Sequence, residues 1–139
     1  MDNQKIDPGY IQGRINPRML ESMLVRILTN SVLFQEASRL LKPEHFSAEE
    51  TGFAAIWRAA LLIHERGGEL SYTSMVDVVD KLINDDPEGI LSEDYENIMR
   101  EDPSDPGMLY WAFERVVPDK LDLDTGRELL RQFLEERTV

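Results

Sequence analysis

Apolar residues recur along most of the chain at the i, i+3, i+4 and i+7 spacing of one helical face, and not with the alternation of a half-buried strand. Pro, Gly, Asn and Ser interrupt these apolar stripes at positions where helices typically begin and end. The pattern predicts an all-α fold, a compact bundle of about six helices. We expect helices over residues 16–29, 31–41, 47–66, 72–83, 108–117 and 124–137, with a shorter one over 92–100.

The stretch from Ser47 to Arg66 is predicted to be the central helix of this bundle. Ser47 and Glu50 have the spacing of a capping box, which satisfies two backbone donors at a helix start. Gly67 and Gly68 follow, and glycine readily adopts the left-handed conformation that ends helices. Because the helix is apolar nearly all round, we expect it to be buried on several sides. The predicted core side chains, on this helix and around it, are Leu24, Ile27, Leu40, Phe46, Phe53, Ile56, Trp57, Leu61 and Val79.

Side chains that can accept a hydrogen bond from a first-turn amide mark the start of the other long helices. Asn16, Asn30 and Ser71 are the predicted N-caps of three of them, and Asp124 or Thr125 is predicted to cap the last. These caps support the helical boundaries that the apolar stripes suggest.

One domain is predicted over residues 16–137, after a flexible N-terminal tail over residues 1–15. A chain of 139 residues is a suitable length for a single domain. Residues 84–105 form an acidic segment, with nine acidic residues against the single base Arg100. The remaining part, residues 108–137, is predicted to form a C-terminal helical hairpin.

The predicted hairpin joins Met108–Val117 and Leu129–Leu134 across Pro118 and a short polar link. A protruding hairpin has two flanks, and one domain core rarely covers both, so we expect an apolar flank that pairs with a second copy. The alternative is that these side chains pack on the Phe53–Leu61 helix and that the domain is monomeric. The predicted interface residues are Met108, Leu109, Trp111, Phe113, Leu130 and Phe133.

The formal net charge is −12, from 27 acidic residues against 15 Lys and Arg. The basic residues form no run, so we expect no direct binding of nucleic acid, whose phosphates would be repelled. A basic protein partner, or no charged partner at all, fits this charge better. No apolar run reaches the roughly 18 residues that cross a membrane, and no signal peptide is apparent. Cysteine is absent, which fits a reducing compartment, and we expect a cytoplasmic protein without a membrane partner.

Patterns that carry chemistry are missing from the sequence. It contains no G-x-x-x-x-G-K-[ST] phosphate loop, no G-x-G-x-x-G and no G-x-S-x-G. We therefore predict no catalytic residue, no cofactor and no metal site in this segment. His64 lies on the inward stripe of the central helix, where a hydrogen-bonded core histidine is expected, and His45 is expected to be exposed in a turn.

One stretch approaches a calcium-binding loop. Asn84, Asp86, Glu88 and Gly89 match positions one, three, five and six of the EF-hand loop. The twelfth position, which should supply a bidentate Glu, is Tyr95. The stretch is therefore better interpreted as a solvated acidic loop.

An acidic hydrolase that uses paired carboxylates is an alternative from another functional class. The adjacent pairs are Glu49-Glu50, Asp85-Asp86 and Glu135-Glu136. Neighbours in sequence do not face each other on a helix, and no pair lies in an apolar stripe that would raise a pKa. The pattern therefore favours a chain that is not an enzyme.

Three successive stretches resemble one known family. They are Leu40–Phe46 (LLKPEHF), the helix that carries Phe53, Trp57 and Leu61, and 65–71 (ERGGELS). Together they resemble the N-terminal domain of DnaB-type replicative DNA helicases, in which a helix ends in L-x-P-E/D-x-F and a long helix ends in R/K-G. The resemblance covers residues 17–83, and residues 127–137 resemble the last helix of that domain. The acidic segment departs from the family pattern.

The resemblance implies a non-catalytic domain that forms the ring collar of the helicase and docks a primase or helicase loader. It implies a homo-oligomer, a dimer for the domain alone and a hexamer in the parent. ATP and Mg would belong to a downstream domain. The alternatives are the helicase-binding domain of a primase, which resembles the same fold, and a stand-alone acidic helical regulator of the replisome.

Overall fold

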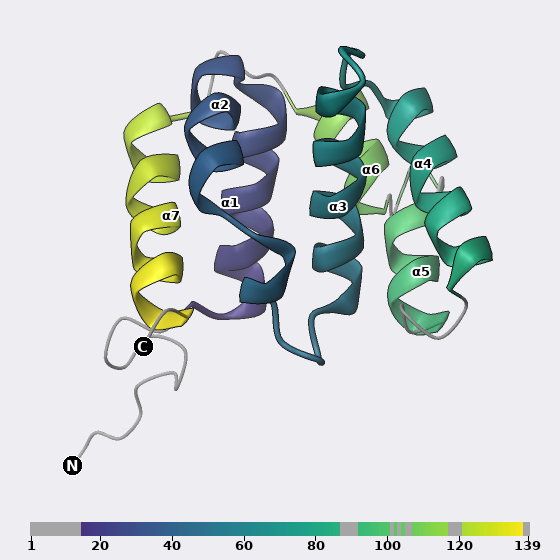
Figure 1. Cartoon of the computed structure of the whole chain (residues 1–139), viewed down its shortest axis with the longest axis horizontal. Coiled ribbons are helices and arrows are strands. Elements are labelled where there is room, and N and C mark those ends of the chain that lie inside the picture. The colour runs from purple at the N-terminus through teal and green to yellow at the C-terminus, as the bar shows by residue number, and fades with distance from the viewer. Residues whose placement is uncertain are drawn as a thin grey trace. The chain divides into compact units, whose positions relative to one another are not determined.

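A computed structural model describes residues 15–86, 92–100, 102, 104, 107–116 and 121–137. Over these residues the chain is helical and contains no strand, which confirms the all-α prediction (Figure 1). The elements are α1 (Pro17–Thr29), α2 (Ser31–Leu40), the 3₁₀ turn η3 (Pro43–His45), α3 (Thr51–Glu65), α4 (Tyr72–Asp85), α5 (Ser92–Met99), α6 (Met108–Tyr110), the π-helical turn η4 (Trp111–Arg115) and α7 (Leu123–Arg137).

The chain divides into two compact units. We call residues 1–41 with 119–139 the terminal unit, and residues 42–118 the central unit. The sequence suggested one bundle around a single central helix, and that helix, α3, belongs to the central unit. The two arms of the predicted hairpin fall in different units, because α6 packs with α4 and α5, whereas α7 packs with α1 and α2.

The terminal unit is built on α1, which packs against both α2 and α7 (Figure 1). Six of its apolar side chains are buried: Leu20, Met23, Leu24, Val25, Ile27 and Leu28. The predicted caps are confirmed, since Asn16 accepts from the Met19 amide and Asn30 from the Leu33 amide, both at 2.9 Å. Ile15 was assigned to the tail, but it is buried and its amide donates to Glu136 Oε2 at 2.7 Å. Residues 1–14 of the predicted tail lie outside the described residues.

In the central unit, α3 begins at Thr51, four residues after the predicted start at Ser47. The Ser47 amide does donate to the Glu50 carboxylate, at 2.8 Å, but the Glu50 amide donates to the Ser47 carbonyl and closes a separate turn before the helix. The C-terminal end of α3 lies before Gly67 and Gly68, as predicted. Gly67 has a φ of 73°, and the Gly68 amide donates to the Ile63 carbonyl at 2.9 Å. A side chain at Gly67 would be strained in this left-handed conformation.

The central unit is closed by backbone approaches that need glycine. Gly107 precedes α6, and a Cβ there would lie 2.4 Å from the Asn97 carbonyl oxygen and 2.7 Å from that of Ile98. Its amide donates to the Arg100 carbonyl at 2.9 Å, so the chain returns closely along the end of α5. A Cβ on Gly52 of α3 would lie 3.0 Å from the Cβ of Asp94 on α5.

The predicted core is mostly buried in the structure. Leu24, Ile27, Phe46, Ile56, Trp57 and Val79 are buried, and Phe53 and Leu61 are half-buried. The prediction was wrong for Leu40, whose side chain is 54% exposed, because the neighbouring Leu41 takes the inward position and is fully buried. The prediction was also wrong for His64, which is exposed near the end of α3, while His45 is half-buried and its Nδ1 accepts from the Lys42 amide.

The remaining boundaries need smaller corrections. Ser71 caps α4 and the short α5 is present, both as predicted. The apolar stretch from Met108 was expected to form one regular helix to Val117. It forms a single α-helical turn followed by a π-helical turn, in which the Val116 amide donates to the Trp111 carbonyl at 3.0 Å. Val117, the final residue of that expected helix, and part of the acidic segment lie outside the described residues.

Candidate functional site

Four of the six predicted interface residues are buried in the structure. Met108, Leu109, Leu130 and Phe133 are at most 7% exposed, so they cannot supply an exposed apolar flank. Phe113 is half-buried, and Trp111 is 40% exposed. Of the predicted interface, therefore, only the Trp111 and Phe113 end of η4 remains accessible.

Exposed apolar side chains are few among the described residues. Val32, Leu40 and Trp111 are the large ones, at 51%, 54% and 40% exposure. Val32 and Leu40 both lie on α2, whereas Trp111 lies on η4. Leu40 adjoins a groove between α2 and α7, and this groove is the candidate site.

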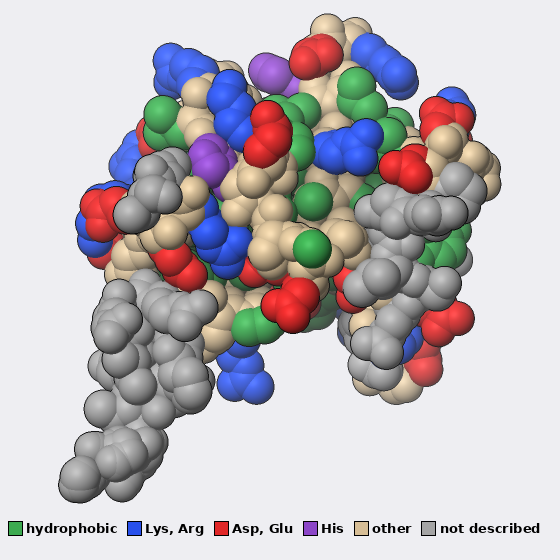
Figure 2. Space-filling view, turned by 60° about the horizontal axis from the view of Figure 1, so that its bottom comes forward, with side chains coloured by type: hydrophobic (Ala, Val, Ile, Leu, Met, Phe, Trp, Pro, Cys, Tyr) green, Lys and Arg blue, Asp and Glu red, His purple; other side chains and the backbone are tan. Residues whose placement is uncertain are grey.

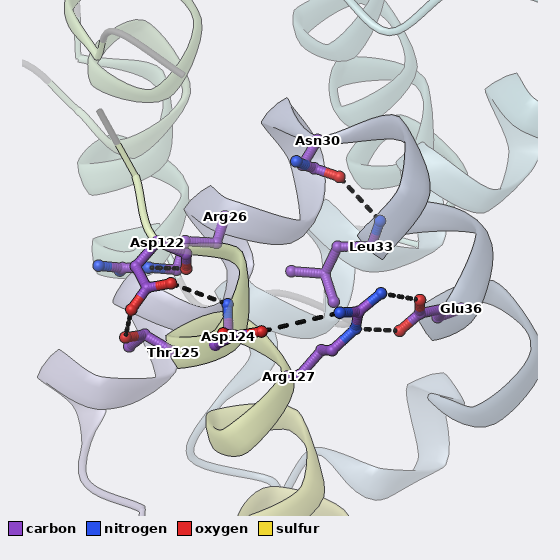
Figure 3. A network of polar contacts seen from close by, with 8 residues as sticks. All are labelled: Arg26, Asn30, Leu33, Glu36, Asp122, Asp124, Thr125 and Arg127. Carbon is purple, nitrogen blue, oxygen red and sulfur yellow. Dashed lines mark hydrogen bonds and ion pairs between the residues drawn. The ribbon is translucent and has the colours of Figure 1, made fainter. Parts of the chain in front are cut away.

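Asp122 fixes where α7 begins. Its carboxylate accepts from the Asp124 amide at 3.0 Å and from the Thr125 hydroxyl at 2.8 Å (Figure 3). Its carbonyl accepts from the Gly126 amide and from Arg26 Nε, both at 3.3 Å. The prediction that Asp124 or Thr125 caps this helix was therefore wrong by two or three residues.

Gly126 lets the first turn of α7 approach α1 and α2 closely. A Cβ at this position would lie 2.5 Å from Leu33 Cδ2 and 3.3 Å from Arg26 Cβ. One residue further, Arg127 lies across α2 and binds Glu36 with both ends of its guanidinium, through Nε at 3.0 Å and Nη2 at 2.7 Å (Figure 3). Such a bidentate pair fixes direction as well as distance, so it sets the register of α7 on α2.

A second guanidinium lies one turn along α7. Arg131 pairs with Glu128 and, at 2.6 Å, with Glu135, so that one base is held between two carboxylates of its own helix. Arg127 is also 3.8 Å from the Asp124 carboxylate. These contacts hold the polar side chains of α7 along its surface.

Between these polar side chains lies an open groove of about 370 Å³. Leucine side chains form its apolar part: Leu130 is buried, Leu134 is half-buried and Leu40 is exposed. The complete lining is Glu36, Leu40, Arg127, Leu130, Arg131, Leu134 and Glu135. A groove with an apolar floor and a charged rim is suited to binding an amphipathic segment of a protein.

Hydrogen bonds lower the pKa values of three carboxyl groups at or near the groove. The hydrogen bond from Arg127 lowers the pKa of the Glu36 carboxyl, and the hydrogen bond from Arg131 lowers the pKa of Glu128. The hydrogen bonds from Thr125 and the Asp124 amide lower the pKa of Asp122. All three carboxyl groups therefore keep their charge to a lower pH than an unpaired carboxyl group would.

Of the six carboxylates in the acidic pairs considered for catalysis, three accept hydrogen bonds from other residues. Glu50 accepts from the Ser47 amide, Glu135 from Arg131, and Glu136 from the Ile15 amide. The described part of the chain contains no group of His, Asp and Glu placed to hold a metal ion. Five residues of the near-calcium loop, residues 87–91, lie outside the described residues.

Basic side chains do not gather on the face shown in Figure 2, where they lie among acidic and apolar ones. None of the described helices is long and apolar enough to span a membrane. A comparison with models of known families, with curated proteins and with solved structures finds no match to this chain.

Proposed function

We propose that this chain is a non-catalytic oligomerisation and protein-docking domain of the kind found at the N-terminus of DnaB-type replicative helicases. In that role it would form part of a ring collar and receive a primase or a helicase loader. ATP and Mg would act in a downstream domain, and the protein would work in the cytoplasm.

The observation that carries the proposal is the connection from α2 to α3. It contains the L-x-P-E-x-F sequence that the family resemblance rests on. Pro43 begins a 3₁₀ turn, and the residues on either side of this turn, Lys42 and Phe46, have extended backbone. The apolar ends of the sequence, Leu41 and Phe46, are both buried. The spacing of this stretch thus has a structural reason, since both apolar ends are anchored and proline starts the turn.

The order of elements after this turn also supports the proposal. A long helix ends at Gly67 in the left-handed conformation, and a short extended stretch leads to Ser71, whose hydroxyl accepts from the Ser74 amide at 3.1 Å at the start of α4. This is the succession that the resemblance implies for the family.

Sedimentation over a concentration series tests the proposal. We expect the chain to self-associate through the accessible end of the predicted interface, so Trp111→Glu should weaken the association at least about tenfold. Val32→Glu is the matched control, since it places the same charge at a side chain of comparable exposure in the other unit. A chain that stays monomeric at high concentration and binds a helicase collar would instead be the helicase-binding domain of a primase.

Calorimetry tests the non-catalytic part of the proposal. We expect no stoichiometric binding of ATP, with or without magnesium, because the sequence has no phosphate loop. Binding with a stoichiometry of one nucleotide per chain would contradict the proposal.

A further inference from the structure

We propose that the groove between α2 and α7 receives the same groove of a second copy, in a two-fold contact between two terminal units. The inference rests on the self-association proposed above and adds a second surface to it. This surface is separate from the Trp111 end of η4, which belongs to the central unit.

Apolar side chains that a partner could cover lie along this groove. Leu40 is the most exposed of the large apolar side chains that the structure describes, at 54%, and it lines the groove together with Leu134, which is half-buried. Leu130, at 4% exposure, closes the bottom of the groove. A two-fold contact in which Leu40 of each copy covers Leu134 of the other removes this surface from water twice, which stabilises the pair.

Charge is distributed very unequally between the two units. The central unit carries 17 acidic and six basic side chains, whereas the terminal unit carries ten acidic and nine basic ones. Nearly all of the net charge of −12 therefore belongs to the central unit. Like charges repel, so two copies oppose each other least where they meet through their nearly neutral terminal units.

The rim of the groove is also balanced in charge. Its charged side chains are two acids and two bases, Glu36, Glu135, Arg127 and Arg131. A two-fold contact brings one patch against itself, so the patch must complement itself. A rim that holds both signs can place a base of one copy beside an acid of the other. The ion pairs within the chain allow this, because the Arg131 and Glu135 side chains are 53% and 65% exposed and a guanidinium has several donors.

The same balance separates a second copy from strongly charged occupants. A basic segment would meet Arg127 and Arg131, and an acidic segment would meet Glu36 and Glu135, so neither gains from the rim as a whole. A second copy brings both signs and also an exposed leucine for the apolar floor. It therefore matches the groove in both respects.

Sedimentation of the Trp111→Glu variant tests the inference, because this background removes the contact proposed for η4. From Arg127 to Glu135 the groove follows about 12 Å of α7, at a rise of about 1.5 Å per residue, so the contact is small and we expect it to be weak. The concentration series must therefore extend to high concentration. We expect an equilibrium between monomer and dimer that persists in this background.

Two matched substitutions on α2 show whether the groove forms the contact. Leu40→Glu and Val32→Glu each add one negative charge, at positions of 54% and 51% exposure, but only Leu40 lines the groove. We expect Leu40→Glu to weaken the remaining dimer at least about tenfold and Val32→Glu to change it by less than about twofold. Leu40→Ser, without a charge, should also weaken it, and thermal melting should show that all variants are folded.

Cross-linking through a single cysteine locates the contact directly. The chain has no cysteine, so Leu40→Cys supplies one thiol per copy, and a short bis-maleimide can then join only two different copies. We expect Leu40→Cys to give a covalent dimer. Val32→Cys, at a similarly exposed position outside the groove, should give several-fold less at the same concentration.

Several outcomes would overturn the inference. They are a Trp111→Glu variant that is monomeric at every concentration, a remaining dimer that Leu40→Glu does not weaken, and equal cross-linking of Leu40→Cys and Val32→Cys. A monomer in which the thiol of Leu40→Cys reacts much more slowly than that of Val32→Cys would identify another segment of the same chain as the occupant and would also overturn it.

The two proposed contacts fail separately. If Trp111→Glu leaves self-association unchanged while Leu40→Glu weakens it, the contact at η4 is lost and the contact at the groove stands. If Trp111→Glu abolishes self-association and Leu40→Glu has no effect, this inference is lost and the proposed function keeps its interface.

Discussion

The terminal and central units hold their helices together by different means. In the terminal unit, polar contacts join residues far apart in sequence: Ile15 with Glu136, Arg26 with Asp122, and Glu36 with Arg127, over separations of 121, 96 and 91 residues. In the central unit, side-chain hydrogen bonds between helices join Thr51 with Asp94 and Tyr95 with Asp80, over separations of 43 and 15 residues. The central unit also relies on close backbone approaches at glycine.

This difference has consequences for stability. The terminal unit needs both ends of the chain, so its helices come together only after a long loop closes, which costs entropy. The central unit is continuous in sequence. We therefore expect variants to act on the two units through different mechanisms.

The largest expected effect is that of Trp57→Ala in the central unit. Trp57 is fully buried on α3, and removing a buried large aromatic side chain costs about 3–5 kcal/mol, enough to unfold a marginally stable domain. Trp111→Ala is the matched control, because Trp111 is 40% exposed and its removal should cost much less. Chemical denaturation followed by circular dichroism measures both. Equal losses would mean that α3 is not the packing centre of the central unit.

Gly107→Ala tests the close approach that closes the central unit. A Cβ there would meet backbone atoms of residues 97, 98 and 100 at 2.4 to 2.8 Å, and backbone cannot rotate away as a side chain can. We expect a loss of about 1–3 kcal/mol or more from this overpacking. Gly68→Ala is the milder control, since its nearest contact would be the Ile63 Cγ2 at 3.2 Å. If both variants melt like the parent, the return of the chain along α5 is not as tight as described.

Features of the fold that depend on residues close together in the sequence were the most predictable. The caps at Asn16, Asn30 and Ser71 were predicted correctly because each satisfies an amide three residues ahead, which a sequence pattern records. Ser47 failed because its capping-box spacing is also satisfied by a turn that precedes the helix. Periodicity could not distinguish Leu40 from Leu41, two adjacent leucines of which only one faces inward.

The candidate site was less predictable, because it depends on where α7 packs. The sequence suggested pairing with the nearest apolar segment, and this placed Leu130 and Phe133 on an exposed flank. In the structure α7 instead packs with α1 and α2, through Gly126 and Arg127. Glu36 and Arg127 are 91 residues apart, and no local pattern in a single sequence connects them. Gly126, a glycine within an otherwise helical pattern, was the one signal in the sequence that α7 approaches other helices closely.

Gly126→Ala should affect the terminal unit selectively. Alanine favours a helix by about 1 kcal/mol over glycine, but the Cβ would lie 2.5 Å from Leu33 Cδ2, and Leu33 is fully buried. Overpacking costs about 1–3 kcal/mol, so we expect a net loss of stability. Leu33→Val removes the clashing reach of Leu33, and a double-mutant cycle should show that the two substitutions together cost less than their sum.

The two tryptophans allow the Gly126→Ala variant to test whether the terminal and central units unfold separately. Trp57 and Trp111 both lie in the central unit, so tryptophan fluorescence reports that unit, whereas circular dichroism reports helices of both. The side chains nearest to Gly126, those of Leu33 and Arg26, belong to the terminal unit. We therefore expect Gly126→Ala to lower the midpoint seen by circular dichroism more than the midpoint seen by fluorescence. Equal shifts would show that the chain unfolds as one cooperative unit, and the distinction between the units would then be only geometric.

The smallest expected effect concerns the Glu36–Arg127 pair and its dependence on pH. Because the hydrogen bond from Arg127 lowers the pKa of Glu36, the carboxylate stabilises the folded state at pH values above its ordinary pKa of 4.5, and this contribution is lost as the pH falls through the lowered value. Glu36→Gln should therefore lower the melting temperature slightly at pH 7, and the difference from the parent should shrink below about pH 4.5.

Acid also removes other contacts of the terminal unit, since the pKa values of Asp122 and Glu128 are lowered in the same way. The comparison of Glu36→Gln with the parent isolates the one pair from these, because both proteins keep them. Glu49→Gln, at an exposed position outside the terminal unit, makes the same change in charge and should leave the melting temperature nearly unchanged at every pH. If Glu36→Gln differs from the parent equally at pH 7 and below pH 3, its effect is not that of a carboxylate paired with Arg127. The register of α7 on α2 would then depend on the packing of Gly126 alone.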